Sequence, residues 1–442
     1  MTNLMLREPV EENVLTQQVP RRPGPSRRRR GGFWLVAAGL SALTAFSTAP
    51  SGLYGIYARE DQLSPLTITL VYSVYAAGIL FSLLLVGHVS DWYGRRTLLV
   101  PAVLTALLAS LVFASSSSLP ALFLGRVLTG VSLGAAVAAA SAWLTDLDAP
   151  PGAAATRRAQ IVATVANVGG LAIGPLLAGL VAVHVTPDPR RVALVFTAVL
   201  TLALAAVALA PEGRPRPHPR PPYRPQRLTV PVAARAQFGA ALTGDFLVFS
   251  VFGIFAGLAS PFLSGTLHRP SPVLAGLAVL VSFGVGALTQ VSTMTWPLRR
   301  LLALGIPVLV VGLTVVVSAA WVRPPSLALF LVGAALVGVG SGAIYRSTLT
   351  VVLTAAPAGE RAGALALFFV VGYVGLSLPV VGAGIALLYV SFKVVLLAFA
   401  VVVATGVLLA SPLLLRLSTP GGPTSGRATL PATPRGGNRG RP

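Results

Sequence analysis

The feature that most constrains this chain is a series of about a dozen uninterrupted apolar runs, each roughly 20 residues or longer. An α-helix rises about 1.5 Å per residue, so a run of this length crosses the roughly 30 Å hydrocarbon core of a bilayer. Only 10% of the 442 residues are charged, whereas about 25% is usual in soluble domains. The sequence therefore excludes a soluble globular fold and predicts an all-α membrane protein that crosses the bilayer many times.

Charged residues, prolines and glycines bound the apolar runs and divide them into two sets of six. The first six predicted transmembrane helices lie near residues 33–57, 66–88, 97–117, 119–146, 159–184 and 191–210. The second six lie near residues 237–262, 272–295, 301–321, 326–356, 362–389 and 392–415. The intervening residues 211–235 hold eight prolines and six arginines without an apolar run, which is typical of a solvated linker.

An internal repeat indicates that the two sets are related bundles. Three features recur at one offset of 204 residues: Trp92 with Trp296, Arg95-Arg96 with Arg299-Arg300, and Pro175 with Pro379. We therefore expect six-helix bundles at residues 33–210 and 236–415, joined by the cytoplasmic linker 211–235. The tails, residues 1–32 and 416–442, are rich in arginine, proline and glycine, and we expect both to be disordered.

The basic residues indicate how the chain sits in the membrane. The chain has 33 basic and 12 acidic residues, and 25 of the basic ones fall in the tails and the even-numbered connections. By the positive-inside rule, both termini and the linker are cytoplasmic, in a multi-pass protein of the cell membrane. The basic excess predicts contact with anionic lipid headgroups. Nucleic acid is not an expected partner, because the basic tails lack interleaved aromatic residues.

Several kinds of chemistry are missing from the sequence. The chain has no cysteine, and its only lysine, Lys393, is followed by Val394 and so cannot belong to a nucleotide-binding P-loop. Its four histidines fall at predicted helix ends or in loops without the spacing of a metal site. We therefore expect no enzyme activity, no catalytic residues, no cofactor and no metal.

The connection between the second and third runs carries a recognisable motif. Residues 87–96 read Gly-His-Val-Ser-Asp-Trp-Tyr-Gly-Arg-Arg. This segment resembles the loop signature Gly-x-x-x-Asp-Arg-x-Gly-Arg-Arg of the major facilitator superfamily and departs from it at Trp92. The resemblance covers the transmembrane region and implies the major facilitator fold, with two bundles that rock around a central cavity. It also implies a conformational gate on the cytoplasmic side, for which the candidate residues are Gly87, Asp91, Gly94, Arg95, Arg96 and Asp146.

The fifth predicted helix carries a second motif. Gly170, Gly174, Pro175 and Gly179 follow a pattern close to the Gly-x-x-x-Gly-Pro-x-x-Gly-Gly of exporting antiporters in this superfamily. Glycines four residues apart let helices approach closely, and the proline removes one helix hydrogen bond. The resemblance favours export, while helix packing alone is the structural alternative.

Three charged residues lie well inside predicted helices and are candidates for the cavity or for ion coupling. Arg126 matches the Arg-x-x-x-Gly pattern of the fourth helix in this superfamily, where it is associated with proton coupling or with bracing the first helix. Asp245 and Arg346 lie at similar predicted depths in the seventh and tenth helices. A charge inside the membrane costs roughly 3 kcal/mol, so we expect the two to pair, either as a structural ion pair or as a proton-carrying one.

The resemblance implies a monomeric secondary active transporter that exports a small organic molecule in exchange for protons. One departure is that the first predicted helix contains no acidic residue, although many such antiporters have one there. A proton-coupled importer of a nutrient is one alternative. The other is a membrane subunit or sensor without transport of its own, for example a permease served by a separate ATPase. The 32 arginines against one lysine favour a bacterial source with a GC-rich genome.

Overall fold

The computed structural model describes residues 27–86, 93–148, 153–212, 225, 227–230, 234–357 and 359–416. Twelve helices in these residues are long and apolar enough to cross a membrane. Those of the first half are α1 (Arg27–Glu60), α2 (Pro65–Leu85), α4 (Arg95–Ser115), α5 (Leu119–Leu147), a fifth span made of α6 (Ala153–Thr164), η2 (Val165–Gly169) and α7 (Gly170–His184), and α8 (Pro189–Leu209). Those of the second half are α9 (Arg235–Gly265), α10 (Pro272–Ser292), α11 (Leu298–Trp321), α12 (Leu327–Ala355), α13 (Arg361–Ala386) and α14 (Phe392–Arg416).

The expected fold class is confirmed, because the described residues form helices and contain no strand. The predicted tail boundary was wrong at one end, because α1 begins at Arg27 rather than near residue 33. Packing explains the extension: Gly32 contacts the Pro211 ring, and Phe33 is buried beneath the guanidinium of Arg158. The expected disorder of residues 1–26 and 417–442 lies outside the described residues, and so does most of the predicted linker.

Several helices begin at the same kind of signal. Ser64, Asp188, Ser271 and Ser326 each precede a helix, and the side chain of each accepts a hydrogen bond from a backbone N–H in its first turn. Three of these four helices also have proline at the first helical position, where its missing N–H costs nothing. All four caps lie on one face of the bundle, which we call the far face. The opposite face, where α1 begins and α14 ends, is the terminal face.

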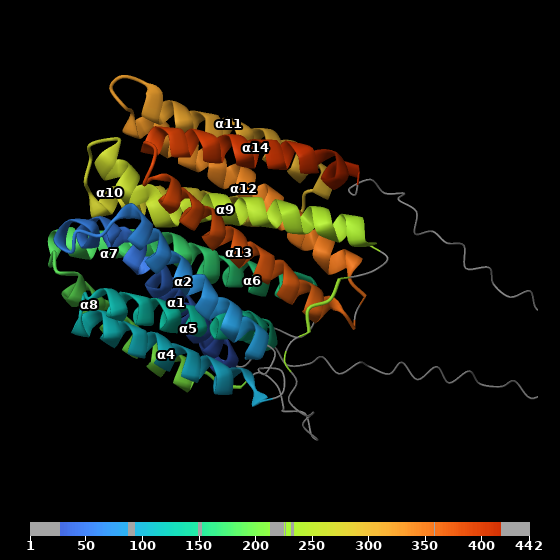
Figure 1. The fold of residues 1–442 in the computed structure, drawn as a ribbon. Coiled ribbons are helices and arrows are strands. Elements are labelled where there is room, and N and C mark those ends of the chain that lie inside the picture. The colour runs from blue at the N-terminus through green and yellow to red at the C-terminus, as the bar shows by residue number, and fades with distance from the viewer. Residues whose placement is uncertain are drawn as a thin grey trace, which may run out of the picture.

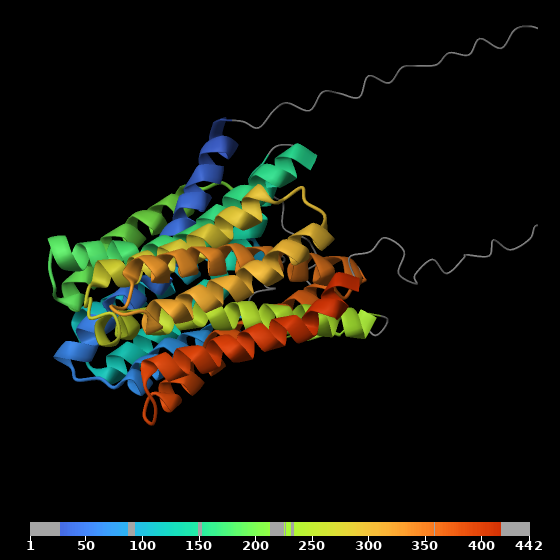
Figure 2. The same ribbon diagram turned by 90° about the horizontal axis from the view of Figure 1, so that it is seen from above.

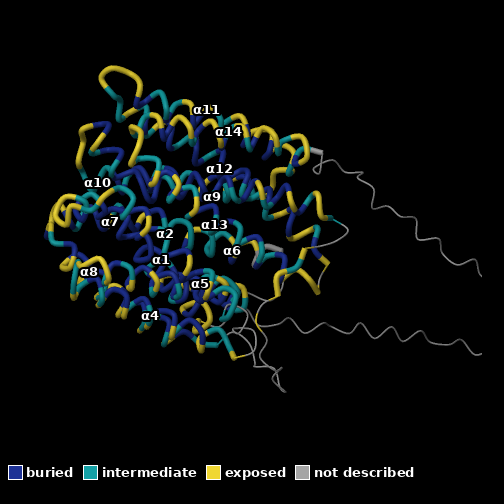
Figure 3. Tube along the Cα trace, in the orientation of Figure 1, coloured by how far each residue is buried: buried dark blue, intermediate teal, exposed yellow. Residues whose placement is uncertain are grey.

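Two pairs of helices make most of the contact between the halves. The α7 helix packs along α10, and α2 packs along α13, so each contact joins one helix of the first half to one of the second. Figure 1 shows α9, α11, α12 and α14 on one side and α4, α5 and α8 on the other, with α2, α7 and α13 between them. Figure 2, turned by 90°, shows the same helices running roughly parallel. Buried residues follow the inner faces of these helices, and exposed ones follow the outside and the connections (Figure 3).

Glycines bring the halves together at the far face. A Cβ on Gly179 of α7 would lie 2.5 Å from the Pro272 carbonyl oxygen at the start of α10. A Cβ on Gly55 of α1 would lie 2.5 Å from Ser260 Oγ in α9. Since real Cβ atoms essentially never approach so closely, only glycine permits these contacts. The two halves are therefore in tight contact toward the far face.

Candidate functional site

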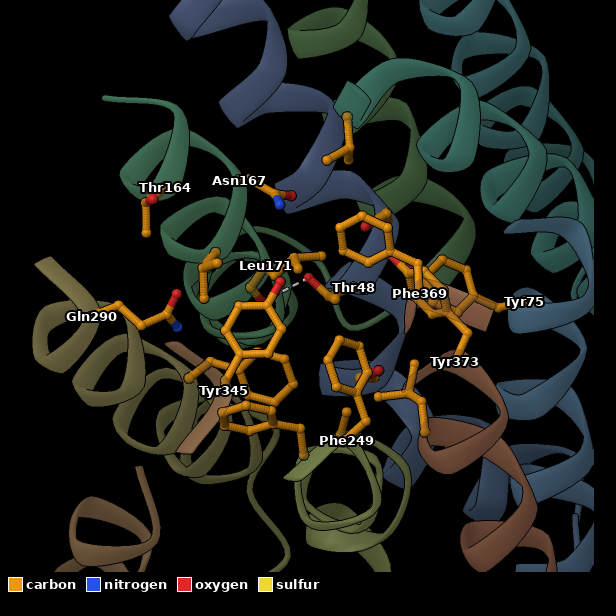
Figure 4. A pocket seen from close by; sticks show the side chains of 18 of the residues that line it. Thr48, Tyr75, Thr164, Asn167, Leu171, Phe249, Gln290, Tyr345, Phe369 and Tyr373 are labelled. Carbon is orange, nitrogen blue, oxygen red and sulfur yellow. Dashed lines mark hydrogen bonds between the residues drawn. The ribbon is translucent and has the colours of Figure 1, made fainter. Parts of the chain in front are cut away.

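A cavity of about 260 Å³ lies between the halves. It is lined from mid-membrane toward the terminal face, where it includes Ser141, near the end of α5, and Gln290, near the end of α10. Figure 4 shows side chains from both halves pointing into it, with Thr48 and Asn167 facing Phe249, Tyr345 and Tyr373. Because the halves touch at the far face, the cavity extends toward the terminal face only.

Arg126 lies in the wall of the cavity that the first half contributes. Its side chain is 1% exposed, Nη1 donates to the Ser47 carbonyl oxygen at 2.9 Å, and Nη2 donates to the Tyr54 hydroxyl. The guanidinium carbon lies 5.2 Å from the ring centre of Tyr54 and 5.8 Å from that of Tyr75, within the range of cation–π attraction. The bond to Ser47 connects α5 to α1, and the role of Arg126 in bracing the first helix or in proton coupling stays a prediction.

The fifth span is interrupted beside the cavity by the π-helical turn η2. Such turns are rare and occur often at functional sites, because the wider turn changes where side chains point. Asn167 lies in η2, lines the cavity, and has a buried Oδ1 without a hydrogen-bond partner among the described residues. Our sequence analysis missed this residue, although Asn167 is the only asparagine within the predicted spans.

All four motif residues of the fifth span lie after this turn, in α7. Gly170 packs against Thr44, and Gly174 against the Ala45 carbonyl, so both let α7 approach α1. Pro175 contacts Gly52 of α1 and Gly276 of α10, while Gly179 contacts Pro272 of α10. The motif therefore occupies the seam between α1, α7 and α10. Close packing is its visible role, and a role in export stays a prediction.

The second half contributes an aromatic wall that our sequence analysis also missed. The ring of Phe249 lies 5.8 Å from that of Tyr345 and 5.7 Å from that of Tyr373, measured between ring centres. All three rings line the cavity. They come from α9, α12 and α13, so no local sequence pattern groups them.

Asp245 lies one helical turn from Phe249 on α9 and is 0% exposed. Both of its carboxylate oxygens lack a hydrogen-bond partner within the described residues. Gly372 of α13 faces it, and a Cβ there would come within 2.6 Å of Oδ2. An unpartnered carboxylate is costly in this setting, which makes Asp245 the most unusual polar group of the second half.

The expected pair between Asp245 and Arg346 is not formed in this structure, and that expectation was wrong for this conformation. The Arg346 guanidinium instead donates to the carbonyl oxygen of Gln290 at 3.0 Å and to that of Met294. Carbonyls at a helix end have no partner within the helix, so Arg346 satisfies one of them in the last turn of α10 and a second one just beyond the helix. Equal depth along two helices did not mean that the side chains face each other.

The candidate gate is described in part. Arg95 Nε lies 3.3 Å from Asp146 Oδ2, so the start of α4 is paired with the end of α5. Gly94 precedes α4 at a φ of 100°, a backbone conformation that favours glycine. Arg96 is exposed. Gly87 and Asp91 lie outside the described residues, and the gating role of the group stays a prediction.

Comparisons with known proteins address the family and the fold. Over 144 residues the chain is 31% identical to the arabinose-proton symporter of Bacillus subtilis (strain 168), covering 32% of this chain and 31% of that protein. Over 99 residues it is 34% identical to the putative metabolite transport protein YncC of the same strain, covering 22% and 21%. The alignments thus span less than a third of either relative.

The crystal structure of the nucleoside transporter NupG matches 88% of this chain and 100% of its own at a TM-score of 0.65. Its sequence identity of 11% supports the fold alone. The sequence model of the Major Facilitator Superfamily matches residues 34–296, which is more than half of the chain. Together with twelve helices long and apolar enough to cross a membrane, this match shows that the chain is a multi-pass membrane protein that belongs to the Major Facilitator Superfamily.

Proposed function

We propose that this protein moves a small organic molecule across the cell membrane by alternating access and couples that movement to protons. The observation that carries the proposal is the unpartnered Asp245 carboxylate directly behind the aromatic wall of the cavity. When protonated, this carboxyl is neutral and suits its buried position. When ionised, it requires water or a cation. A rearrangement of α9 against α13 would supply that change and would load or release one proton in each cycle.

The proposed direction is export, with proton entry as the driving force. The Gly-Pro motif of the fifth span supports it, because its glycines and proline lie where α7 meets α1 and α10. Uptake by proton symport is the second candidate, favoured by the relative named an arabinose-proton symporter. Both use the same cavity and differ in whether substrate and proton move in opposite directions or together.

The proposed orientation places the terminal face in the cytoplasm. Arg95, Arg158, Arg299 and Arg361 all lie near helix ends on this face, as the positive-inside rule requires of a cytoplasmic side. The structure then corresponds to an inward-facing state, with the cavity open to the cytoplasm. We propose that the protein works as a monomer in the plasma membrane, since one chain encloses the whole cavity.

The experiment that tests this function uses the purified protein in liposomes that contain a pH-sensitive dye. A panel of organic acids, neutral aromatic compounds and sugars is added under an imposed pH gradient. We expect at least one compound to cause protein-dependent proton movement, and a protonophore to abolish its accumulation. The sign of the pH change distinguishes antiport from symport. Transport that needs ATP and ignores the protonophore would overturn the proposal in favour of a permease served by an ATPase.

A further inference from the structure

The two walls of the cavity differ in chemistry. Of its thirteen lining residues from the first half, nine carry a hydroxyl, amide or guanidinium group. Of the ten from the second half, only Gln290, Tyr345 and Tyr373 carry such a group, and six are aromatic, against two aromatic residues in the first half. A bound molecule therefore meets hydrogen-bonding groups on one side and rings on the other. This division favours a molecule with one polar end and one apolar body.

The polar wall is also positively charged. Among the described residues that line the cavity, Arg126 alone carries a charge. Its two identified hydrogen bonds go to neutral oxygens, the Ser47 carbonyl and the Tyr54 hydroxyl, and no carboxylate in the described part of the chain forms an ion pair with it. A guanidinium this deeply buried normally has an anionic partner, since neutral acceptors compensate its charge only partly.

Nothing in the aromatic wall supplies that anion. Asp245, the one acidic residue of α9, does not line the cavity and faces Gly372 on α13. The charge of Arg126 is thus free to attract an anion that enters from the terminal face. The opposite rings, including Phe249 and Phe369, offer apolar contact area and few hydrogen bonds to such a ligand.

We propose that the substrate is an amphipathic organic monocarboxylate, held with its carboxylate toward Arg126 and its apolar or aromatic body against the wall of Phe249, Tyr345 and Phe369. This inference rests on the proposed function and names its substrate class. A sugar fits the cavity poorly, because a polyol carries hydroxyls around its whole ring and the aromatic wall would leave many of them unpaired. The cavity of about 260 Å³ suits a molecule with a single ring or a short alkyl chain.

The test is calorimetric titration of the purified protein in lipid nanodiscs at pH 7, with no proton gradient. Three probes are compared: 3-phenylpropionate, its neutral analogue 3-phenylpropionamide, and arabinose. The first two share shape and ring and differ in the charge that Arg126 recognises. We expect 3-phenylpropionate to bind at least about tenfold more tightly than the amide, and arabinose to bind more weakly than either.

Variants test what each wall of the cavity contributes to the binding of the acid and the amide. Arg126→Gln should bring the acid and the amide to equal affinity, and Arg126→Lys should keep part of the preference because it keeps the charge. Phe369→Ala should weaken both aromatic probes to the same extent and leave their ratio unchanged. If Arg126→Gln does not fold, the inference is still tested by two measurements. One is the affinity of the unaltered protein for the three probes, and the other is the ratio of acid to amide affinity in Arg126→Lys.

Equal affinity of the acid and the amide, tighter binding of arabinose, or no binding of any probe would overturn the inference. None of these binding results tests proton coupling, because coupling is measured separately as proton movement in liposomes. Tight binding of 3-phenylpropionate by a protein that moves no protons would instead support this substrate class and contradict the proposed function.

Discussion

The carboxylate of Asp245 in α9 lies directly against Gly372 in α13, where an added Cβ would come within 2.6 Å of Oδ2. Gly372, which has no side chain, thus makes room for the unpartnered carboxylate of Asp245. In the same helix, Gly382 has nothing within 4 Å of its virtual Cβ. Gly372 and Gly382 therefore form a matched pair within α13, one beside the proposed proton carrier and one facing open space.

The first prediction concerns this contact. Gly372→Ala should destabilise the protein by about 1 to 3 kcal/mol, because the methyl group forces the Asp245 side chain or the α9 backbone to move. Gly382→Ala should be nearly neutral. Thermal unfolding in detergent measures both. In an Asp245→Ala background the cost of Gly372→Ala should largely disappear, and a full cost there would show that the clash is with other atoms.

The second prediction concerns Arg346. Because its guanidinium donates to the carbonyl oxygens of Gln290 and Met294 rather than pairing with Asp245, Arg346→Gln should lower stability by about 1 to 2 kcal/mol. The ratio of protons to substrate moved in liposomes should not change. Arg346→Lys should recover part of the stability. A change in that ratio, with stability intact, would restore Arg346 to the coupling machinery.

The third prediction concerns the pair of Arg95 and Asp146. Asp146→Asn and Arg95→Gln should each slow transport while leaving substrate affinity within about twofold, because the pair lies at the terminal face and away from the cavity lining. The double variant should be no worse than the more severe single one, as expected when both changes remove the same interaction. Additive losses in transport rate would indicate that the two residues act separately.

The fourth prediction concerns closure at the far face. Gly276 of α10 contacts the backbone of Pro175 and Leu176 in α7, so Gly276→Val should wedge the halves apart there. The chain has no cysteine, so a single Ser51→Cys inside the cavity can be labelled selectively. With Gly276→Val, a membrane-impermeant maleimide applied from the far side should label it several-fold faster. Gly382→Val, on an exposed position, is the control; equal labelling in both would contradict this closure.

The span positions were predictable from sequence, and the contacts between spans were not. The apolar runs placed α5 and α12 within one or two residues of their observed bounds, because the thickness of the bilayer fixes length and composition. Asp245 and Arg346 show the limit. The depth of each residue in the membrane follows from the rise per residue. The direction in which each side chain points depends on the rotation of its helix and on carbonyl acceptors near the end of α10, which no sequence pattern indicates.

The residues that line the cavity were also only partly predictable from the sequence. A lone asparagine in an apolar span was a signal for Asn167, since polar side chains inside a membrane usually face protein or water. The π-helical turn that holds Asn167 has no comparable sequence signature. The aromatic wall is assembled from α9, α12 and α13, so only the three-dimensional packing brings its rings together.

The measurement that tests the central claim most directly compares Asp245→Asn with the unaltered protein in two assays on the same liposomes. One is uptake or extrusion driven by a pH gradient, and the other is exchange of labelled for unlabelled substrate without a gradient. Asparagine resembles the protonated acid in shape and charge, so the account predicts that gradient-driven transport falls to background while exchange continues at a rate within a few-fold of normal. Normal gradient-driven transport by Asp245→Asn would contradict the account and place the coupling proton elsewhere, with Arg126, Glu60 and Asp61 as the next residues to change.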